Sequence, residues 1–188
     1  MADGQLLNPI HPGPQTKDDR FHRLRLVRSR RVGAVTWHRL MAEHGTAHAA
    51  LEALPGIARA AGVDDYEVCP AGVVQAELKQ GHMLGATLLV HGDSDYPQAL
   101  MDIPDAPPVL WVRGNIALLN HPAVGIVGAR NASSLGTRMA RRLGAGLSEA
   151  GITVVSGLAY GIDTAAHSAA MDGQGSTIAV MAGGIDVI

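Results

Sequence analysis

The chain has 188 residues, hydrophobic side chains at 47% of its positions and a formal net charge of −2, which excludes a general electrostatic attraction to nucleic acid or membranes. A single cysteine, Cys69, excludes internal disulfides, and no apolar run approaches the ~18 residues that cross a bilayer. Together with the lack of a signal-peptide core, these features predict a cytoplasmic protein of one medium or two small domains, without a membrane segment.

The N-terminal part of the chain is predicted to be helical. Residues 1–16 are rich in proline and glycine and are expected to form a disordered tail. Residues 17–83 are expected to form a small helical domain, because apolar residues recur there at helical spacing. The expected helices contain Phe21, Leu24 and Val27, then residues 34–43, 47–53 and 71–83.

The segment Leu54-Pro55-Gly56-Ile57 follows the third of these expected helices. Two short helices joined by such a tight turn resemble a helix-hairpin-helix, whose turn amides can bind a phosphate. Such hairpins also occur as plain structural units, so DNA contact through this turn is one of two open hypotheses.

A cationic segment lies at the start of the helical domain. It holds seven of the fifteen cationic side chains, namely Lys17, Arg20, Arg23, Arg25, Arg28, Arg30 and Arg31. A solvated helix face is the simpler interpretation, and contact with nucleic acid or an acidic partner is the alternative.

Three histidines in the same domain, His38, His44 and His48, suggest a metal site at first sight. No carboxylate or cysteine completes a ligand set nearby, and the zincin pattern is absent. We therefore expect surface or capping histidines and no bound metal.

Residues 86–122 have a different character. Residues 87–90 and 109–112 are predicted to form strands, and the four prolines between them exclude a long helix. We expect these strands to join the edge of the main sheet and to hold the helical domain against it.

Three short apolar runs in the last third of the chain each end in a glycine-rich loop. They are residues 124–127, 152–155 and 177–180, with helical patterns between them. This alternation predicts βαβ units and an α/β fold with a parallel sheet. Because parallel strands end at one shared edge, the three loops should gather there, where glycine amides and helix N-termini favour an anion.

The helix predicted from about residue 134 to 150 has apolar side chains at successive i+4 positions, which indicates a buried stripe. The stripe residues are Leu135, Met139, Leu143 and Leu147. Its other faces and the preceding loop carry four arginines, against a single acid, Glu149, within residues 121–151. These arginines, which form a basic patch suited to a polyanion, are Arg130, Arg138, Arg141 and Arg142.

Taken together, these motifs resemble those of the DNA-processing protein A (DprA/Smf) family. The motifs that carry the resemblance are Tyr96-Pro97 with Leu100 and Ile103, Asp105 with the prolines after it, Gly114, Ile126 to Arg130, Gly136, Ser156 to Asp163, Ala166-His167 and Thr177 to Asp186. The resemblance implies a helical, SAM-like domain over residues 17–83 and an extended Rossmann-like domain over residues 84–188.

The resemblance also implies a function. Such proteins bind single-stranded DNA during natural transformation, protect it and help to load RecA recombinase; they are not known as enzymes and need no cofactor. The family's phosphate motif falls on Gly128, Ala129 and Arg130, where the loop pattern independently predicts an anion site. The candidate DNA- and phosphate-binding residues are Gly128, Ala129, Arg130, Arg138, Ser156, Gly157, Tyr160, Gly161, Gly183 and Gly184.

The chain ends at Ile188, in the middle of the fold that the resemblance implies. In the family more sheet and helix follow, with the dimer-forming surface and often a winged-helix domain. We therefore expect a truncated sheet with an open edge, and a homodimer formed through regions beyond Ile188.

Two features of the candidate site have alternative interpretations. Tyr160 either stacks on a base or packs on a neighbouring loop. Arg130 either binds phosphate or pairs with a carboxylate such as Asp163 or Asp186 and only joins the loops.

Enzyme functions fit the sequence less well. A dinucleotide enzyme needs Gly-x-Gly-x-x-Gly, but the chain has only Gly125-x-x-Gly128. A LOG-type nucleotide monophosphate phosphoribohydrolase, the main alternative, has a Pro-Gly-Gly-x-Gly-Thr loop and a catalytic glutamate, where this chain has Ala182-Gly-Gly-Ile-Asp186. A serine hydrolase built from Ser156, Asp163 and His167 lacks the Gly-x-Ser-x-Gly elbow.

Overall fold

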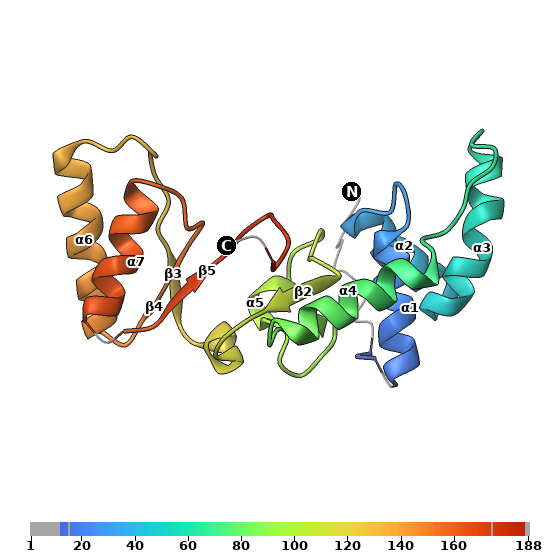
Figure 1. Ribbon diagram of the computed structural model, residues 1–188, viewed down its shortest axis with the longest axis horizontal. Helices are drawn as coiled ribbons and strands as arrows, with labels where there is room; N and C mark the ends of the chain where they lie inside the picture. The colour runs from blue at the N-terminus through green and yellow to red at the C-terminus, as the bar shows by residue number, and fades with distance from the viewer. Residues whose placement is uncertain (1–11, 15, 174, 187–188) are drawn as a thin grey trace, which may run out of the picture. The chain divides into compact units, whose positions relative to one another are not determined.

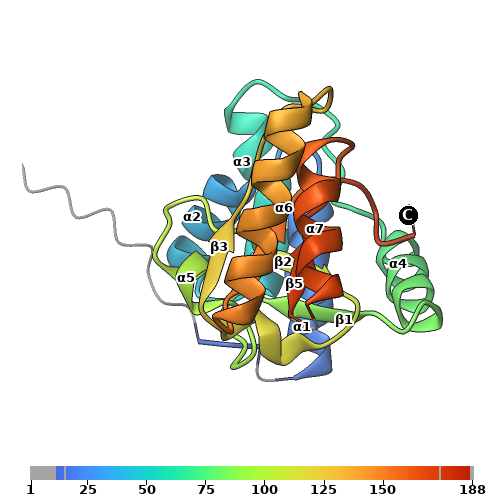
Figure 2. The ribbon, with the colours of Figure 1, turned by 90° about the vertical axis from the view of Figure 1, so that its left-hand side faces the viewer.

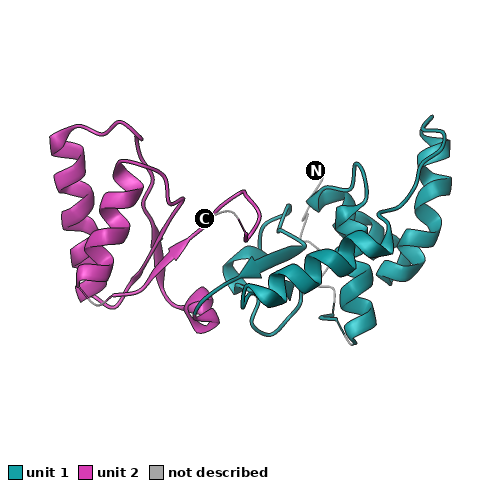
Figure 3. Cartoon of the chain, viewed as in Figure 1, with its two compact units in different colours: residues 1–114, 188 teal, residues 115–187 magenta. Residues whose placement is uncertain are grey.

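The computed structural model describes residues 12–14, 16–173 and 175–186, and its contacts divide the chain into two compact units (Figure 3). Unit 1 runs to Gly114, and unit 2 begins at Asn115. The domain boundary predicted between residues 83 and 84 falls inside unit 1, because the first two strands pack on its helices. Most of the predicted disordered tail lies outside the described residues.

Unit 1 is built on four helices, which lie where they were predicted except that the third continues beyond its predicted end. They are α1 (Lys17–Arg28), α2 (Ala34–His44), α3 (Ala47–Ala60) and α4 (Ala71–Met83) (Figure 1). Thr16 and Thr46 cap the N-termini of α1 and α3. The hydroxyl oxygen of each accepts a hydrogen bond from the backbone N–H of the residue three positions later. Trp37, Leu40 and Leu51 lie in the core that the first three helices enclose.

The predicted turn at Leu54-Pro55-Gly56-Ile57 is wrong, because α3 continues through all four residues. Pro55 removes one helical hydrogen bond, which costs about 3 kcal/mol in a helix interior. Leu54 and Ala58 are buried on the same face of α3, and this packing keeps the chain helical across the proline. The hypothesis of phosphate binding by a turn at this position therefore loses its geometric basis.

The cationic segment holds unit 1 together. The guanidinium of Arg20 donates two hydrogen bonds to the Asp93 carboxylate, at 2.7 and 2.8 Å, and Arg28 forms a similar pair with Glu77. Further contacts join Arg23 to the carbonyls of Pro12 and His91, Arg25 to the carbonyl of Cys69, and Arg30 to the ring of Tyr66. The predicted solvated face is wrong for Arg20, Arg23 and Arg25, which are partly or fully buried against partners distant in the sequence, whereas Arg28 and Arg30 are exposed.

The three histidines that suggested a metal site lie in different environments. His48 is exposed beside Glu52, and His44 ends α2. His38, in contrast, is buried, and its ring lies 4.7 Å from that of His91, centroid to centroid. The expectation of a surface or capping role is therefore wrong for His38.

Burial of His38 predicts an acid-sensitive unit 1. Burial lowers the pKa of His38 by disfavouring the charged ring, and the bond from its Nε2–H to the Ala106 carbonyl, 2.9 Å long, opposes this only in part. The unfolded chain therefore protonates this histidine near the ordinary pKa of about 6.5, whereas the folded chain protonates it only at lower pH. The folded state consequently loses stability relative to the unfolded state as the pH falls. We expect the melting temperature to fall between about pH 7.5 and pH 5.5.

The His38→Gln variant tests this prediction, because the amide keeps an N–H donor for the Ala106 carbonyl and does not titrate. Its melting temperature should depend less on pH than that of the wild type, whereas the exposed His121→Gln should leave the dependence unchanged. An equal pH dependence in His38→Gln and the wild type would show that this ring is not responsible.

The first two strands form a sheet of their own. Strand β1 (Thr87–Val90) pairs in antiparallel fashion with β2 (Val109–Val112), and the short helix α5 (Gln98–Met101) lies between them in the chain. Their expected addition to the edge of the main sheet is therefore wrong. Leu88 and Val90 instead pack with Leu24 of α1 and Val74 of α4, which satisfies the apolar face of the pair within unit 1.

Unit 2 is a three-stranded parallel sheet with two helices on one face. After the short 3-10 helix η1 (Ile116–Asn120), its elements are β3 (Ala123–Gly125), α6 (Ser134–Glu149), β4 (Thr153–Ser156), α7 (Ile162–Asp172) and β5 (Thr177–Ala179). The strand order is β3-β4-β5, so two right-handed crossovers in the same direction place α6 and α7 side by side (Figures 1 and 2). This arrangement leaves β3 and β5 as edge strands.

The predicted buried stripe of α6 is wrong except for Leu147, which is partly buried against the core of unit 2. Leu135, Met139 and Leu143 are 62%, 49% and 51% exposed. The buried face consists of Ala140, Gly144 and Ser148. Small residues are needed there because α7 approaches so closely that a Cβ on Gly144 would meet the carbonyl oxygen of Ala166.

Candidate nucleic-acid interface

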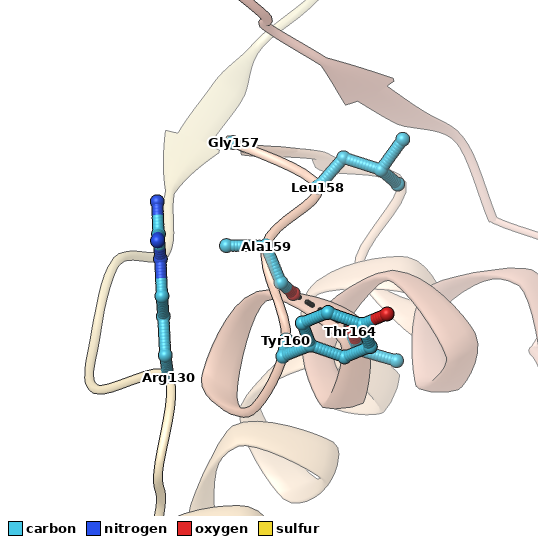
Figure 4. A pocket seen from close by; sticks show the side chains of 6 residues that line it. All are labelled: Arg130, Gly157, Leu158, Ala159, Tyr160 and Thr164. Atoms are coloured by element: carbon cyan, nitrogen blue, oxygen red, sulfur yellow. Dashed lines mark hydrogen bonds between the residues drawn. The ribbon is translucent and has the colours of Figure 1, made fainter. Parts of the chain in front are cut away.

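The first two glycine-rich loops of unit 2 meet at the carboxyl ends of β3 and β4. The Ile162 N–H, at the start of α7, donates a hydrogen bond of 3.2 Å to the Ala129 carbonyl. Between the loops lies a hollow of about 520 Å³ (Figure 4). The hollow is lined by Arg130, Gly157, Leu158, Ala159, Tyr160 and Thr164.

Two glycines make this close approach possible. Gly161 has a φ of +84°, in the left-handed region, and a Cβ there would meet the carbonyl oxygens of Ala129 and Arg130. A Cβ on Gly128 would likewise meet the side chain of Ile162. Both glycines were predicted as site residues, and the structure places them where the loops contact each other.

Asp163 occupies two amides of the second loop. Its Oδ2 accepts hydrogen bonds from the N–H groups of Gly157, at 3.1 Å, and Ala159, at 3.3 Å. The carboxylate is buried and lies in the first turn of α7, where the helix dipole favours negative charge. An anion therefore cannot use these two amides without displacing Asp163.

The backbone N–H groups of the first loop remain available to a ligand. The N–H groups of Gly128, Ala129 and Arg130 donate to no other residue that the structure describes. The side chain of Arg130 is exposed at the hollow and forms no ion pair within the described part of the chain. Ser133 caps α6, which begins just beyond the loop, and the positive end of the helix dipole therefore faces the same region. The first loop therefore combines amides and a guanidinium that have no partners in the described structure with the N-terminal end of a helix.

The second loop presents large side chains to solvent. Tyr160 is 84% exposed as a whole residue, so its side chain does not pack on a neighbouring loop. Leu158 is 47% exposed and has a φ of +58°, which is unusual for a bulky residue. Leu158, Ala159 and Thr164 were not among the predicted site residues, although Leu158 and Ala159 belong to a loop that the sequence pattern singled out.

Not all predicted site residues line the hollow. Ser156 is buried, and its hydroxyl donates a hydrogen bond of 2.6 Å to the Ile126 carbonyl, which joins β4 to the segment after β3. Gly183 and Gly184 follow β5 and lie outside the lining, and Arg138 is exposed on α6. A DNA-binding role for these four residues stays a prediction.

The geometry around Ser156 does not form a hydrolase triad. His167 Nδ1 lies 2.6 Å from Thr177 Oγ1, whose own proton is donated to the Val154 carbonyl, so Nδ1 carries the proton of the histidine. Burial lowers the pKa of His167, and the nearby Asp163 opposes this shift. His167 thus packs α7 against the sheet.

Two kinds of site are missing from the part of the chain that the structure describes. No group of three histidine, cysteine or acidic side chains is arranged to hold a metal ion. No helix there is long and apolar enough to span a bilayer.

Comparison with known proteins gives consistent matches over both parts of the chain. A sequence model of the family described as DNA recombination-mediator protein A matches residues 87–188, and one described as a DprA-like N-terminal HHH domain matches residues 17–79. The chain is 41% identical over 118 residues to the protein Smf of Synechocystis sp., covering 59% of this chain and 29% of that protein. It is 47% identical over 95 residues to the DNA processing protein DprA of Streptococcus pneumoniae, covering 50% of this chain and 33% of that protein.

The structure is also similar to a solved one, the X-ray structure of DNA processing protein A from Streptococcus pneumoniae. The TM-score is 0.54 at 36% sequence identity, over 72% of this chain and 48% of that chain. The predicted fold class, a helical domain followed by an α/β domain with a parallel sheet, is confirmed by these matches. The chain spans roughly a third of the length of the curated relatives described here.

Proposed function

The chain belongs to the DNA-processing protein A (DprA/Smf) family, and from this premise we propose that it binds single-stranded DNA through the first loop of unit 2. The observation that carries the proposal is the position of Arg130, exposed at the hollow beside backbone N–H groups without partners in the described structure. A guanidinium and several amides together match the oxygen atoms of a phosphate. The other predicted site residues are proposed to contribute around this centre.

The surrounding charge supports a polyanion as the ligand. Residues 121–151 contain four arginines and one acid, and Arg138, Arg141 and Arg142 are exposed on α6. Six of the seven residues of the N-terminal cationic segment are arginines, and five of these have partners inside unit 1. The basic side chains of α6 and its preceding loop therefore remain the better candidates for phosphate contacts.

The proposal extends to a role in natural transformation and recombination, in which the protein protects incoming DNA and helps to load RecA recombinase. Family membership supports this wider role. It also supports the proposals that the protein is cytoplasmic, that it acts by binding DNA and not as an enzyme, and that it forms homodimers. A RecA filament-formation assay on single-stranded DNA coated with a competing single-strand-binding protein tests the loading role. The chain should shorten the lag before filaments form.

The binding proposal predicts a strong dependence on salt. Each phosphate contact contributes about −0.7 to the slope of log K against log salt concentration for single strands. Two or three contacts at the first loop and α6 should give a slope of about −1.4 to −2. Fluorescence anisotropy with a labelled oligothymidylate at several salt concentrations measures this slope. Binding that does not respond to salt would contradict a phosphate site.

A further inference from the structure

The second loop of unit 2 has features that phosphate binding does not explain. Asp163 occupies two of its amides, yet its tip leaves Leu158 47% and Tyr160 84% exposed. Apolar side chains at the lining of a hollow contribute binding energy when a ligand covers them. The left-handed backbone of Leu158 adds a second cost, which a glycine at the same position would avoid.

The structure fixes Leu158 in this position. The two N–H groups that donate to Asp163 Oδ2 belong to Gly157 and Ala159, the residues on either side of Leu158. The Ala159 carbonyl accepts a further hydrogen bond of 2.7 Å from the Thr164 hydroxyl. Because Asp163 and Thr164 lie in the first turn of α7, the loop tip is fixed to the end of a helix.

The side chains at the hollow are arranged with the cation on one side. In Figure 4, Arg130 lies on one side of the second loop, and the Leu158 and Tyr160 side chains leave the loop on the other side. A nucleotide has the same division, since its phosphate is charged and its base is flat and largely apolar on its two faces. The hollow thus offers complementary chemistry to both parts of one nucleotide.

We propose that Leu158 and Tyr160 form the two walls of a slot that receives one unpaired base of the strand whose phosphate is bound at Arg130. Asp163 is the positioning residue of this slot. The inference rests on the proposed function and adds the base contact to it. The Tyr160 ring stacks on one face of the base, and the Leu158 side chain covers the other face.

The slot selects for an unpaired base and accepts any of the four. Bases in a duplex are covered on both faces by their neighbours, so only a single strand can place one between two side chains. The Thr164 hydroxyl is already donated to a carbonyl, the Arg130 guanidinium is assigned to the phosphate, and the side chains of the two proposed walls carry no polar group except the Tyr160 hydroxyl. Sequence readout through hydrogen bonds to the base edge is therefore weak.

The test compares oligothymidylate with an abasic oligonucleotide of the same length, which has the same phosphates and no bases. Wild type should bind oligothymidylate about fivefold more tightly or better, as expected for one stacked base. Leu158→Gly and Tyr160→Ala should lose this preference and bind the abasic strand as wild type does. Tyr160→Phe keeps the ring and should keep the preference.

Leu158→Gly is informative because glycine adopts the left-handed conformation freely. Its melting temperature should equal or exceed that of wild type, so weaker binding cannot reflect unfolding. The matched control is Asp65→Gly, which makes the same backbone change at an exposed position of unit 1 with a φ of +52° and should not alter binding.

The outcomes separate the slot from the phosphate site. Salt-dependent binding that is equal for both oligonucleotides, or a base preference that survives both Leu158→Gly and Tyr160→Ala, overturns the slot and leaves the proposed function in place. A wild-type chain that binds neither oligonucleotide overturns both. Loss of the preference in the two variants, with unchanged binding of the abasic strand, supports the slot.

Discussion

Arg130→Ala should lower the affinity of the chain for single-stranded DNA by at least tenfold, about 1.4 kcal/mol, while the melting temperature changes little. The guanidinium lies near three backbone N–H groups without partners in the described structure. Its planar set of N–H donors can bind two phosphate oxygens in a bidentate geometry that a lysine ammonium group does not reproduce. Arg130→Lys should therefore recover part of the affinity. Anisotropy titrations and thermal unfolding of the same samples provide both quantities.

Arg59→Ala is the matched control for Arg130→Ala. It removes the same charge from an exposed position near the end of α3, in the other unit, and should leave the affinity close to that of wild type. The alternative role of Arg130, as a partner of a carboxylate that only joins the loops, makes the opposite prediction. In that case Arg130→Ala would melt several degrees lower and its folded fraction would bind DNA normally.

Gly161→Ala should destabilise unit 2 by about 2–5 kcal/mol and weaken DNA binding at temperatures where the variant is still folded. The φ of +84° is strained for alanine, and the new Cβ would meet the backbone oxygens of Ala129 and Arg130. The first loop must move to accept the methyl group, and Arg130 moves with it. For a unit of this size the melting temperature should fall by about 8 °C or more.

Two further glycines separate the causes of this effect. Gly151→Ala has a similar backbone strain, with a φ of +71° and no atom within 4 Å of the new Cβ, so it should cost only about 1–2 kcal/mol. Gly146→Ala, on an open face of α6, should stabilise the helix slightly. If Gly161→Ala costs no more than Gly151→Ala, the contact between the two loops is not important for stability.

The elements of this protein follow from local sequence. The helices at residues 34–44 and 71–83 and the strands at residues 87–90 and 109–112 lie where periodicity and chain-breaking residues predict them. The glycine-rich loops were also predictable, because strand ends followed by glycine and a helix N-terminus meet at one edge of a parallel sheet. Gly128, Arg130, Gly157, Tyr160 and Gly161 lie where these two loops meet.

Periodicity could not predict which face of a helix is covered. The spacing of Leu135, Met139 and Leu143 indicates an apolar stripe, but burial is decided by the element that packs nearby. Here α7 approaches the face with Gly144, because small residues allow two helices to come close. In the same way Pro55 signals a turn by its local chemistry, and only the packing of Leu54 and Ala58 keeps α3 continuous.

The sequence alone determined the family, the parallel sheet and the loop that carries Arg130, because these depend on residue types and their spacing along the chain. Tertiary structure decided which groups remain available to a ligand. Asp163 occupies two amides of the second loop, five arginines of the cationic segment find partners in unit 1, and Leu158 stays about half exposed. The bonds of the arginines join residues distant in the sequence, and those of Asp163 depend on the conformation of its loop, so only the folded chain shows which polar groups they use.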